Sequence, residues 1–556
     1  MIPRLSLYGR PMPLPPTSPF LEGSFRSIAI VEPTLGFHRE QPSMDLPPGA
    51  TPYSDNFIMR EGALEPRPML ALSSSTPNPM QVAVTGLFNS VDVNGNNFPL
   101  LSGTTRVAFL SSTSWSVASY VSAGGMNDAP SASTISYWDM AQVYAPDPDQ
   151  NVVVMANGSN QSLYCWASGT TVFSTLTEAP PARYITAFDN YLIAFNIIDP
   201  SGAHFVQRVQ WSDRGNPFSW TPASGSLAGN EDLLAMNGAG TRIMANENRL
   251  ILFSTEEIWQ GFEGTFPSVF QFQPLDRTTG CPFPWTAVMT QDGIYFLSSD
   301  YRVYKLDKSG GPSVVVSEPV HKSIRDAIAY PERSWSVYDP LTNHYCLFYP
   351  VTGGSGTPQQ ALYLNLSTGA WAPQSFDPVS GGLSLTRGAQ GFTPSSAATI
   401  WSQTSTAGIT WAQAQGSWSG QLAQQVSATN LLYVGSSSGT AYVMASTYTS
   451  DAGTPVTCYW RSGSLGGGQP QWQKTVRELR IDYQTDSASS LTLQMSTNQG
   501  TTFDAGVAQT LPAQSGESQA IFYPYVAGRY PSFKVSQTGT RARLYRFWVE
   551  LVGQGR

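Results

Sequence analysis

The sequence predicts an all-β protein: a β-propeller of six to eight irregular blades, with an extended N-terminal arm and a C-terminal antiparallel β-sandwich. Charged residues make up only 12% of the 556 residues, about half the ~25% of an ordinary soluble domain. The chain also holds 49 Gly and 42 Pro, whereas amphipathic surface helices need Lys and Glu on their solvent-facing side. Hydrophobic residues, at 41%, are sufficient for packed cores. Together these observations favour short strands joined by turns.

The first 45 residues are expected to form an extended Pro-rich arm. Pro13, Pro15, Pro16 and Pro19 cluster there, and the segment shows little hydrophobic periodicity. Such a segment cannot build a core of its own. No stretch of the chain approaches the ~18 uncharged apolar residues of a membrane helix, so no membrane insertion is expected.

Residues 46–460 are predicted to form the propeller, with loop insertions. A short apolar strand, a polar turn and a second apolar strand recur, with clear copies that begin at residues 184, 242, 287 and 335. Their turns carry Asp-Asn, Glu-Asn, Asp-Gly and Thr-Asn pairs, which are typical of hairpins. The intervals of 58, 45 and 48 residues are close to the ~40–50 residues of a four-stranded blade. Two or three β-sandwiches would produce a similar pattern and remain the alternative.

Residues 461–556 are predicted to be a linker followed by the C-terminal sandwich. The Gly-rich stretch SGSLGGGQPQ (462–471) is typical of a linker. Segments such as VRELRIDYQ (476–484) and SLTLQMST (490–497) alternate apolar and polar residues strictly. This period of two indicates strands with one buried and one solvated face.

No metal or cofactor site is predicted. The chain has four cysteines and four histidines, and neither set has the spacing of metal ligands. They are Cys165, Cys281, Cys346, Cys458, His38, His204, His321 and His344. The stretch DVNGNN (92–97) imitates a calcium loop, but its glycine is misplaced and no glutamate closes it.

Two motifs suggest catalysis, and neither is sufficient for it. GSSSG (435–439) matches the G-x-S-x-G nucleophile elbow but lies between two predicted strands, whereas the elbow needs a strand-to-helix turn. STNQGTTF (496–503) resembles one Asp-box of sialidase-type propellers, with Asn498 and Phe503 in the Asp and Trp places. Asp-boxes are structural turns. We therefore predict no catalytic residues and no enzymatic activity.

Four further motifs follow one another in a fixed order. They are LPPGATPYSDNFIMREGALEPRP (46–68), WSDRGNPFSW (211–220), ENRLILFSTEEIWQ (247–260) and QDGIYFLSSDYRVYKLD (291–307). Together they resemble the tail hub or nozzle proteins of short-tailed bacteriophages, which include packaged-DNA stabilisation proteins. The resemblance spans roughly residues 45–310, and it departs at Met69, where glycine is common, and at Asn216, where aspartate is common. The residues that match the family motifs are Asn56, Arg60, Gly62, Arg67, Pro68, Trp211, Asp213, Gly215, Pro217 and Trp220.

The resemblance implies a virion tail subunit that forms a homo-oligomeric ring, a hexamer, below the portal and adaptor proteins. The ring would retain and conduct genomic DNA without sequence-specific binding and would support tail fibres or spikes. The net charge of −8 fits this role, because a basic protein would grip the phosphates. The alternatives are a carbohydrate- or receptor-binding propeller and a sialidase-like glycosidase.

The stretch WSDRGNPFSW is interpreted as a turn between blade strands. Asp213 is expected to accept hydrogen bonds from backbone N–H groups, and Gly215 to supply a permissive backbone angle. Trp211 and Trp220 are expected to be buried against neighbouring sheets.

Overall fold

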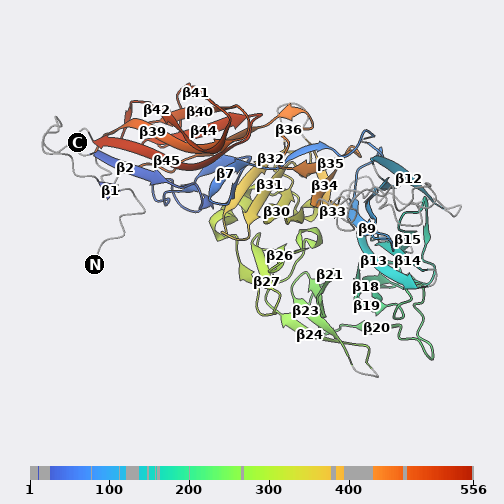
Figure 1. The fold of residues 1–556 in the computed structure, drawn as a ribbon. Helices are drawn as coiled ribbons and strands as arrows, with labels where there is room; N and C mark the ends of the chain where they lie inside the picture. The colour runs from blue at the N-terminus through green and yellow to red at the C-terminus, as the bar shows by residue number, and fades with distance from the viewer. Residues whose placement is uncertain are drawn as a thin grey trace, which may run out of the picture.

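The computed structural model describes residues 10–11, 26–76, 78–104, 106–111, 113–120, 137–146, 149–156, 158, 163–199, 201–264, 268–376, 383–392, 430–466 and 472–553. Strands dominate these residues, and they form a propeller with a two-sheet sandwich beside it (Figure 1). No helix in these ranges is long and apolar enough to cross a membrane.

In the described part of the chain, seven four-stranded blades surround one axis, which confirms the predicted β-propeller. The first six blades use strands that follow one another in sequence and pair antiparallel. They are β9–β12 (Gly86–Val91, Asn97–Ser102, Val107–Ser111, Ser114–Tyr120), β13–β16 (Asp139–Pro146, Asp149–Ala156, Tyr164–Ala167, Val172–Thr175), β17–β20 (Ala182–Phe188, Tyr191–Ile198, His204–Trp211, Gly229–Asp232), β21–β24 (Gly240–Asn246, Arg249–Ser254, Ile258–Glu263, Phe270–Asp276), β25–β28 (Val288–Met289, Gly293–Leu297, Val303–Asp307, Val314–Val315) and β29–β32 (Trp335–Asp339, His344–Tyr349, Gln360–Asn365, Trp371–Ser375).

The seventh blade closes the ring with a strand from the other end of the chain. Its first three strands are β33 (Leu385–Phe392), β34 (Asn430–Ser436) and β35 (Ala441–Ala445), and its outermost strand is β8 (Met69–Leu72). The inner strand β33 contacts both β29 and β9, so the last blade meets the first. The first two blades are joined in addition by a parallel pairing of β12 with β16.

Some central blade strands are buried along their whole length, because neighbouring blades cover both of their faces. All eight residues of β18, YLIAFNII, are buried, as are all six of β30, HYCLFY. Continuous apolar runs bounded by turns are the sequence signature of such strands.

The sandwich packs two sheets. One contains β1 (Arg10–Pro11), β2 (Arg26–Val31), β45 (Ala542–Gly553), β39 (Lys474–Thr485), β42 (Gln514–Phe522), β43 (Val526–Gly528), β6 (Phe57–Arg60) and β7 (Ala63–Pro66); the other contains β5 (Tyr53–Asp55), β38 (Thr457–Arg461), β44 (Ser532–Thr538), β40 (Ser489–Ser496) and β41 (Val507–Leu511). The two sheets pack against each other where the Trp460 ring of β38 stacks on the Phe547 ring of β45, with ring centroids 5.2 Å apart. Leu491, Leu493 and Met495 are buried on one face of β40, as the period of two predicts.

The strand pairings correct the predicted domain boundaries at 45 and 460. β2 pairs with β45 from Arg26↔Val552 to Val31↔Phe547, and β5 pairs with β38. Strands β2, β5, β6 and β7 therefore belong to the sandwich and not to a separate arm or to the propeller. β38 also lies in the sandwich, ahead of the predicted linker. Local sequence patterns indicate a strand but do not show which distant sheet edge it joins.

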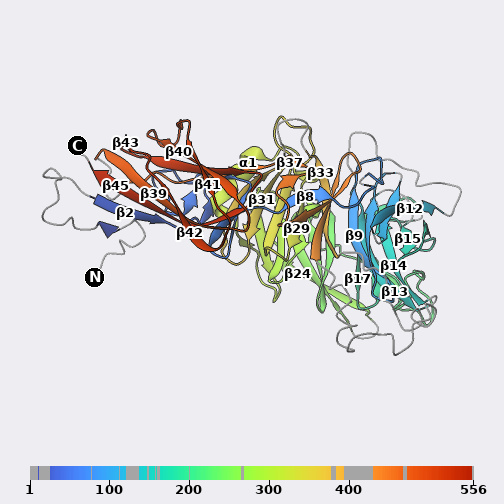
Figure 2. The same ribbon diagram turned by 45° about the horizontal axis from the view of Figure 1, so that its top comes forward.

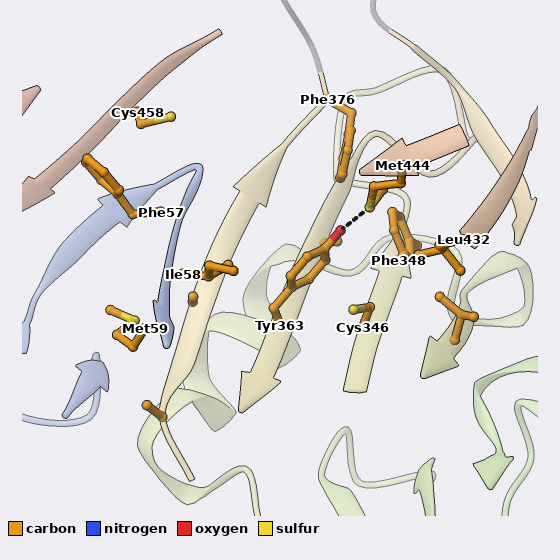
Figure 3. Packing of buried hydrophobic residues seen from close by; sticks show 14 of the residues in the cluster. Phe57, Ile58, Met59, Cys346, Phe348, Tyr363, Phe376, Leu432, Met444 and Cys458 are labelled. Atoms are coloured by element: carbon orange, nitrogen blue, oxygen red, sulfur yellow. Dashed lines mark hydrogen bonds between the residues drawn. The ribbon is translucent and has the colours of Figure 1, made fainter. Parts of the chain in front are cut away.

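One apolar core runs across the boundary between the two domains. Ile58 and Met59 of β6 belong to the same buried cluster as Tyr363 and Phe348 of the sixth blade (Figure 3). In both ribbon views the sandwich lies beside the sixth and seventh blades and far from β12 and β15 (Figure 2). The two domains are thus packed together through a shared core.

Candidate functional site

Arg67 of the first family motif is fully buried where the sandwich meets the seventh blade. Its guanidinium donates two hydrogen bonds to the carboxylate of Asp451 in β36 (Ser450–Asp451), and its Nε donates to Asn56 Oδ1 at 3.0 Å. It lies 4.0 Å from the ring centre of Phe376. Asp451 Oδ1 also accepts from the backbone N–H of Leu70 in the closing strand β8, at 2.9 Å. This network holds the closing strand in place.

Only some residues of the first motif belong to this hydrogen-bond network around Arg67. Asn56 adopts a φ of 60° and donates from Nδ2 to the carbonyl of Thr457 at 3.1 Å. The carbonyl of Pro68 accepts from Arg67 Nη1 at 3.0 Å. Arg60 and Gly62 lie instead in the β6–β7 hairpin, where Arg60 pairs with Glu61 and Glu65 and Gly62 has a φ of 76°.

The second motif forms a turn at the edge of the third blade. Asp213 Oδ1 accepts from the backbone N–H of Leu227 at 2.8 Å, and Gly215 has a φ of 71°. The Trp220 indole N–H donates to the carbonyl of Pro217 at 2.9 Å. Trp211, whose Nε1 donates to the carbonyl of Leu227 at 2.8 Å, packs edge-on against Phe270 of the fourth blade. Both tryptophans are buried, and the two family motifs do not form a common site.

Replacing Trp220 by alanine is expected to lower the free energy of unfolding by about 3–5 kcal/mol, because a large side chain leaves the core between the second and third blades. Chemical denaturation of the purified variant measures this loss. Leu234→Ala, at a side chain that is 84% exposed, is the matched control, with an expected change within about 0.5 kcal/mol. Equal effects of the two substitutions would contradict the buried role of Trp220.

A cluster that the sequence did not predict lies at one end of the propeller axis. Its side chains come from the second, third, fourth, fifth and seventh blades, from the start of an inner strand or just before it. They are Tyr137, Asp139, Tyr184, Arg242, Trp285 and Arg387. Because the inner strands of all blades run in the same direction along the axis, residues at their starts converge. We call this group the axial cluster.

Asp139 and Trp285 organise the axial cluster. Asp139 Oδ1 accepts from Arg242 Nη1 at 2.7 Å, and its Oδ2 accepts from the backbone N–H of Ile185 at 3.0 Å. The guanidinium groups of Arg242 and Arg387 lie 4.9 and 4.3 Å from the ring centre of Trp285.

Burial shifts the pKa values of the axial cluster. It raises the pKa of Tyr184 to about 12 and, together with the nearby charge of Arg242, lowers the pKa of Arg387 to about 10. Burial also raises the pKa of Tyr137. At neutral pH Arg387 is therefore still charged and both phenols are neutral.

A cavity of about 350 Å³ lies between the sandwich and the sixth blade. Asp55 of β5 lines it, and burial raises the pKa of this carboxyl to about 7 against the opposing charge of Arg67. The rings of Tyr53 and Tyr459 stack at 5.5 Å on the same wall. Lys322 of α1 (His321–Ala327) also lines the cavity. At neutral pH Asp55 can either donate or accept a hydrogen bond.

Within the ranges that the structure describes, no group of three or more His, Cys, Asp and Glu residues could hold a metal ion. All four cysteines are free thiols, and burial raises the pKa of Cys281 to about 12. Burial lowers the pKa of His344 to about 4, so this imidazole is neutral. GSSSG joins β34 to β35 in a hairpin, without the helix that a nucleophile elbow requires.

Comparisons with known proteins give similar structures but no matching family. No protein-family model matches the chain, and no curated protein matches its sequence. A family 43 arabinoxylan arabinofuranohydrolase from Bacillus subtilis is similar over 87% of this chain and 98% of its own, with 9% identity and a TM-score of 0.24. An exo-β-1,3-galactanase from Phanerochaete chrysosporium is similar over 87% and 99%, with 10% identity and a TM-score of 0.25. YCF48 from Cyanidioschyzon merolae is similar over 68% and 99%, with 10% identity and a TM-score of 0.36.

These comparisons correct the prediction that the chain is not an enzyme. Two of the similar structures are glycoside-cleaving enzymes. The prediction rested on the lack of a recognisable catalytic motif. Residues that meet only in the folded chain leave no such motif in the sequence. The chain is an all-β protein that combines a seven-bladed propeller with a β-sandwich built from both ends of the chain.

Proposed function

We propose that the chain is a tail hub or nozzle subunit of a short-tailed bacteriophage, which assembles into a ring below the portal and adaptor. The resemblance of four ordered motifs between residues 45 and 310 carries this proposal. Its partners would be further copies of the chain, the adaptor or portal, and a tail fibre or spike.

The position of the first motif supports a role in a mechanically stable assembly. Arg67 links the closing strand of the propeller to the sandwich through Asp451 and Asn56. Next to it, Asn365 and Gln374 of the sixth blade donate to the carbonyls of Met59 and Phe57, at 2.7 and 3.0 Å. A subunit whose domains are joined in this way keeps its shape when neighbouring subunits bind to it.

In this proposal the DNA path lies outside the propeller. Trp285, Arg242 and Arg387 come together at one end of the propeller axis, and the proposal leaves that axis to them. The channel would therefore lie between copies in the ring, lined by their outer surfaces. The net charge of −8 suits such a channel, because a lining of low positive charge retains phosphates weakly.

Electron microscopy of the purified chain, alone and mixed with the adaptor of the same virus, tests the proposal. We expect rings with a central channel, with the sandwich and propeller in the arrangement of Figure 1. A chain that stays monomeric under both conditions and is absent from purified particles by mass spectrometry would contradict it.

The cavity between the domains favours carbohydrate binding as a second candidate function. Stacked aromatic rings offer an apolar surface to the C–H face of a sugar, and Asp55 can donate or accept hydrogen bonds. Glycan-array binding by the isolated chain, and release of reducing sugar from the glycans that bind, test this function. Loss of both signals in Asp55→Asn, but not in Asp326→Asn at the exposed edge of the cavity, would support it; no glycan bound by the wild type would exclude it.

Replacing Asp55 by asparagine is also expected to change how stability depends on pH. The pKa of Asp55 is raised from 3.8 to about 7 in the folded chain. The native state thus binds this proton more tightly, and the resulting stabilisation is full below about pH 4 and is lost as the pH rises through about 7. Thermal unfolding of both proteins between pH 4 and pH 8 should show a flatter profile for Asp55→Asn and its largest gain over the wild type above pH 7. Identical profiles would contradict the raised pKa.

A further inference from the structure

We propose that the axial cluster binds an oxyanion, a carboxylate or phosphate group, between Arg242, Arg387 and Trp285. This inference concerns the propeller itself and does not depend on the assembly of a ring.

The charges in the axial cluster do not balance. Arg242 and Arg387 both approach Trp285, but Asp139 is the only carboxylate among the six cluster residues. Both carboxylate oxygens of Asp139 already accept hydrogen bonds, one from Arg242 and the other from the backbone N–H of Ile185. The phenols add no negative charge, since burial raises the pKa values of Tyr137 and Tyr184. Among the described residues of the cluster, one positive charge therefore lacks a counter-charge.

The cation without a counter-charge in the described part of the cluster is Arg387. Among the described residues, no oxygen accepts a hydrogen bond from its guanidinium, and its Nε is buried without a partner. The Nε of Arg242 is likewise buried and unsatisfied. Buried charged groups in proteins are normally paired, because removing them from water is costly. Two neighbouring guanidinium groups with unused donors thus form a site for an acceptor from outside the chain.

The geometry selects an oxyanion rather than a cation or a neutral ligand. A guanidinium only donates hydrogen bonds, and its planar fork matches the oxygens of a carboxylate or phosphate. Trp285 holds both guanidinium groups against its ring, so their donors are oriented before the ligand arrives. The Arg242 side chain is 16% exposed, so part of the cluster is in contact with solvent.

Titration calorimetry on the full chain tests the proposal with three anionic probes: inorganic phosphate, glucuronic acid and a short oligothymidylate. Glucose is the neutral control. We expect at least one anion to bind and to raise the unfolding temperature in proportion to its concentration, while glucose does neither. Tighter binding of phosphate or oligothymidylate would identify a phosphate ligand, and tighter binding of glucuronic acid a carboxylate ligand. Failure of all three anions to bind at millimolar concentration would overturn the proposal.

Arg387→Met tests the site residue, because methionine keeps much of the side-chain length without any donor. Its affinity for the bound anion should fall roughly 10- to 100-fold, whereas Arg325→Met on the exposed face of α1 should leave it unchanged. In anion-free buffer Arg387→Met should be at least as stable as the wild type, since an unpaired buried charge has been removed. A marked loss of stability in that buffer would show that Arg387 has a partner within the chain and would overturn the proposal, as would unchanged affinity.

Discussion

Replacing Arg67 by methionine is expected to lower the free energy of unfolding by about 3–5 kcal/mol, because Asp451 then remains buried and charged without its partner. Both side chains are almost fully buried, with exposed fractions of 0% and 1%. The substitution also removes the hydrogen bonds of Arg67 to Asn56 Oδ1 and to the carbonyl of Ser375. Chemical denaturation followed by circular dichroism measures the loss.

Two further variants distinguish the loss of stability caused by breaking the buried Arg67–Asp451 pair from any general effect of removing an arginine. Arg325→Met breaks the exposed pair with Asp326 and should cost at most about 1 kcal/mol. The double variant Arg67→Met/Asp451→Leu should recover much of the loss, because it removes both buried charges. A double variant no more stable than Arg67→Met would contradict the assignment of the effect to the unpaired Asp451.

Removing residues 1–72 is expected to abolish folding of both domains. The truncation removes β2, β5, β6 and β7 from the sandwich and β8 from the seventh blade. It exposes the edge of β35, which pairs with β8 from Tyr442↔Leu72 to Ala445↔Met69. Leu70 and Met69 are themselves buried, and the loss of each such side chain costs about 2–5 kcal/mol. The unpaired edges should also drive aggregation.

Size-exclusion chromatography and circular dichroism of the truncated protein measure this effect. A chain lacking only residues 1–25 is the control, because it retains β2 and its full pairing with β45, and we expect it to remain soluble and folded. A monomeric, cooperatively unfolding protein without residues 1–72 would contradict the role of β8 in closing the propeller.

Hairpins and domains with local sequence signals were predictable. The Asp189-Asn190 turn between β17 and β18 has both residues at positive φ, as Asp-Asn hairpin turns require. The alternation in β40 likewise predicted a half-buried strand of a sandwich. These features are determined by residues that are close together in the sequence, so a short stretch of sequence is enough to predict them.

The closing strand and the axial cluster were not predictable because they depend on contacts between distant residues. Nothing in the tetrapeptide Met69–Leu72 identifies β35 as its partner. The two strands are adjacent in the folded blade, but the whole propeller lies between them in the sequence. Arg387 and Trp285 were ordinary residues in the sequence, since each becomes part of a cluster only when seven blades fix the positions of their inner strands. Arg67 was recognised through the family resemblance, but its partner Asp451 carried no signal of its own.

The closing strand has a consequence for biosynthesis. A ribosome delivers β8 before any blade exists, and its partner β35 emerges only after six blades have been made. β2 must wait still longer, because its partner β45 follows the whole propeller in the sequence. The propeller therefore cannot close until β35 has been made, nor the sandwich until β45 has been made, and both early strands need protection from wrong pairings until then. We expect maturation of the chain to be slow and to depend on chaperones that hold its first seventy residues in an unpaired state.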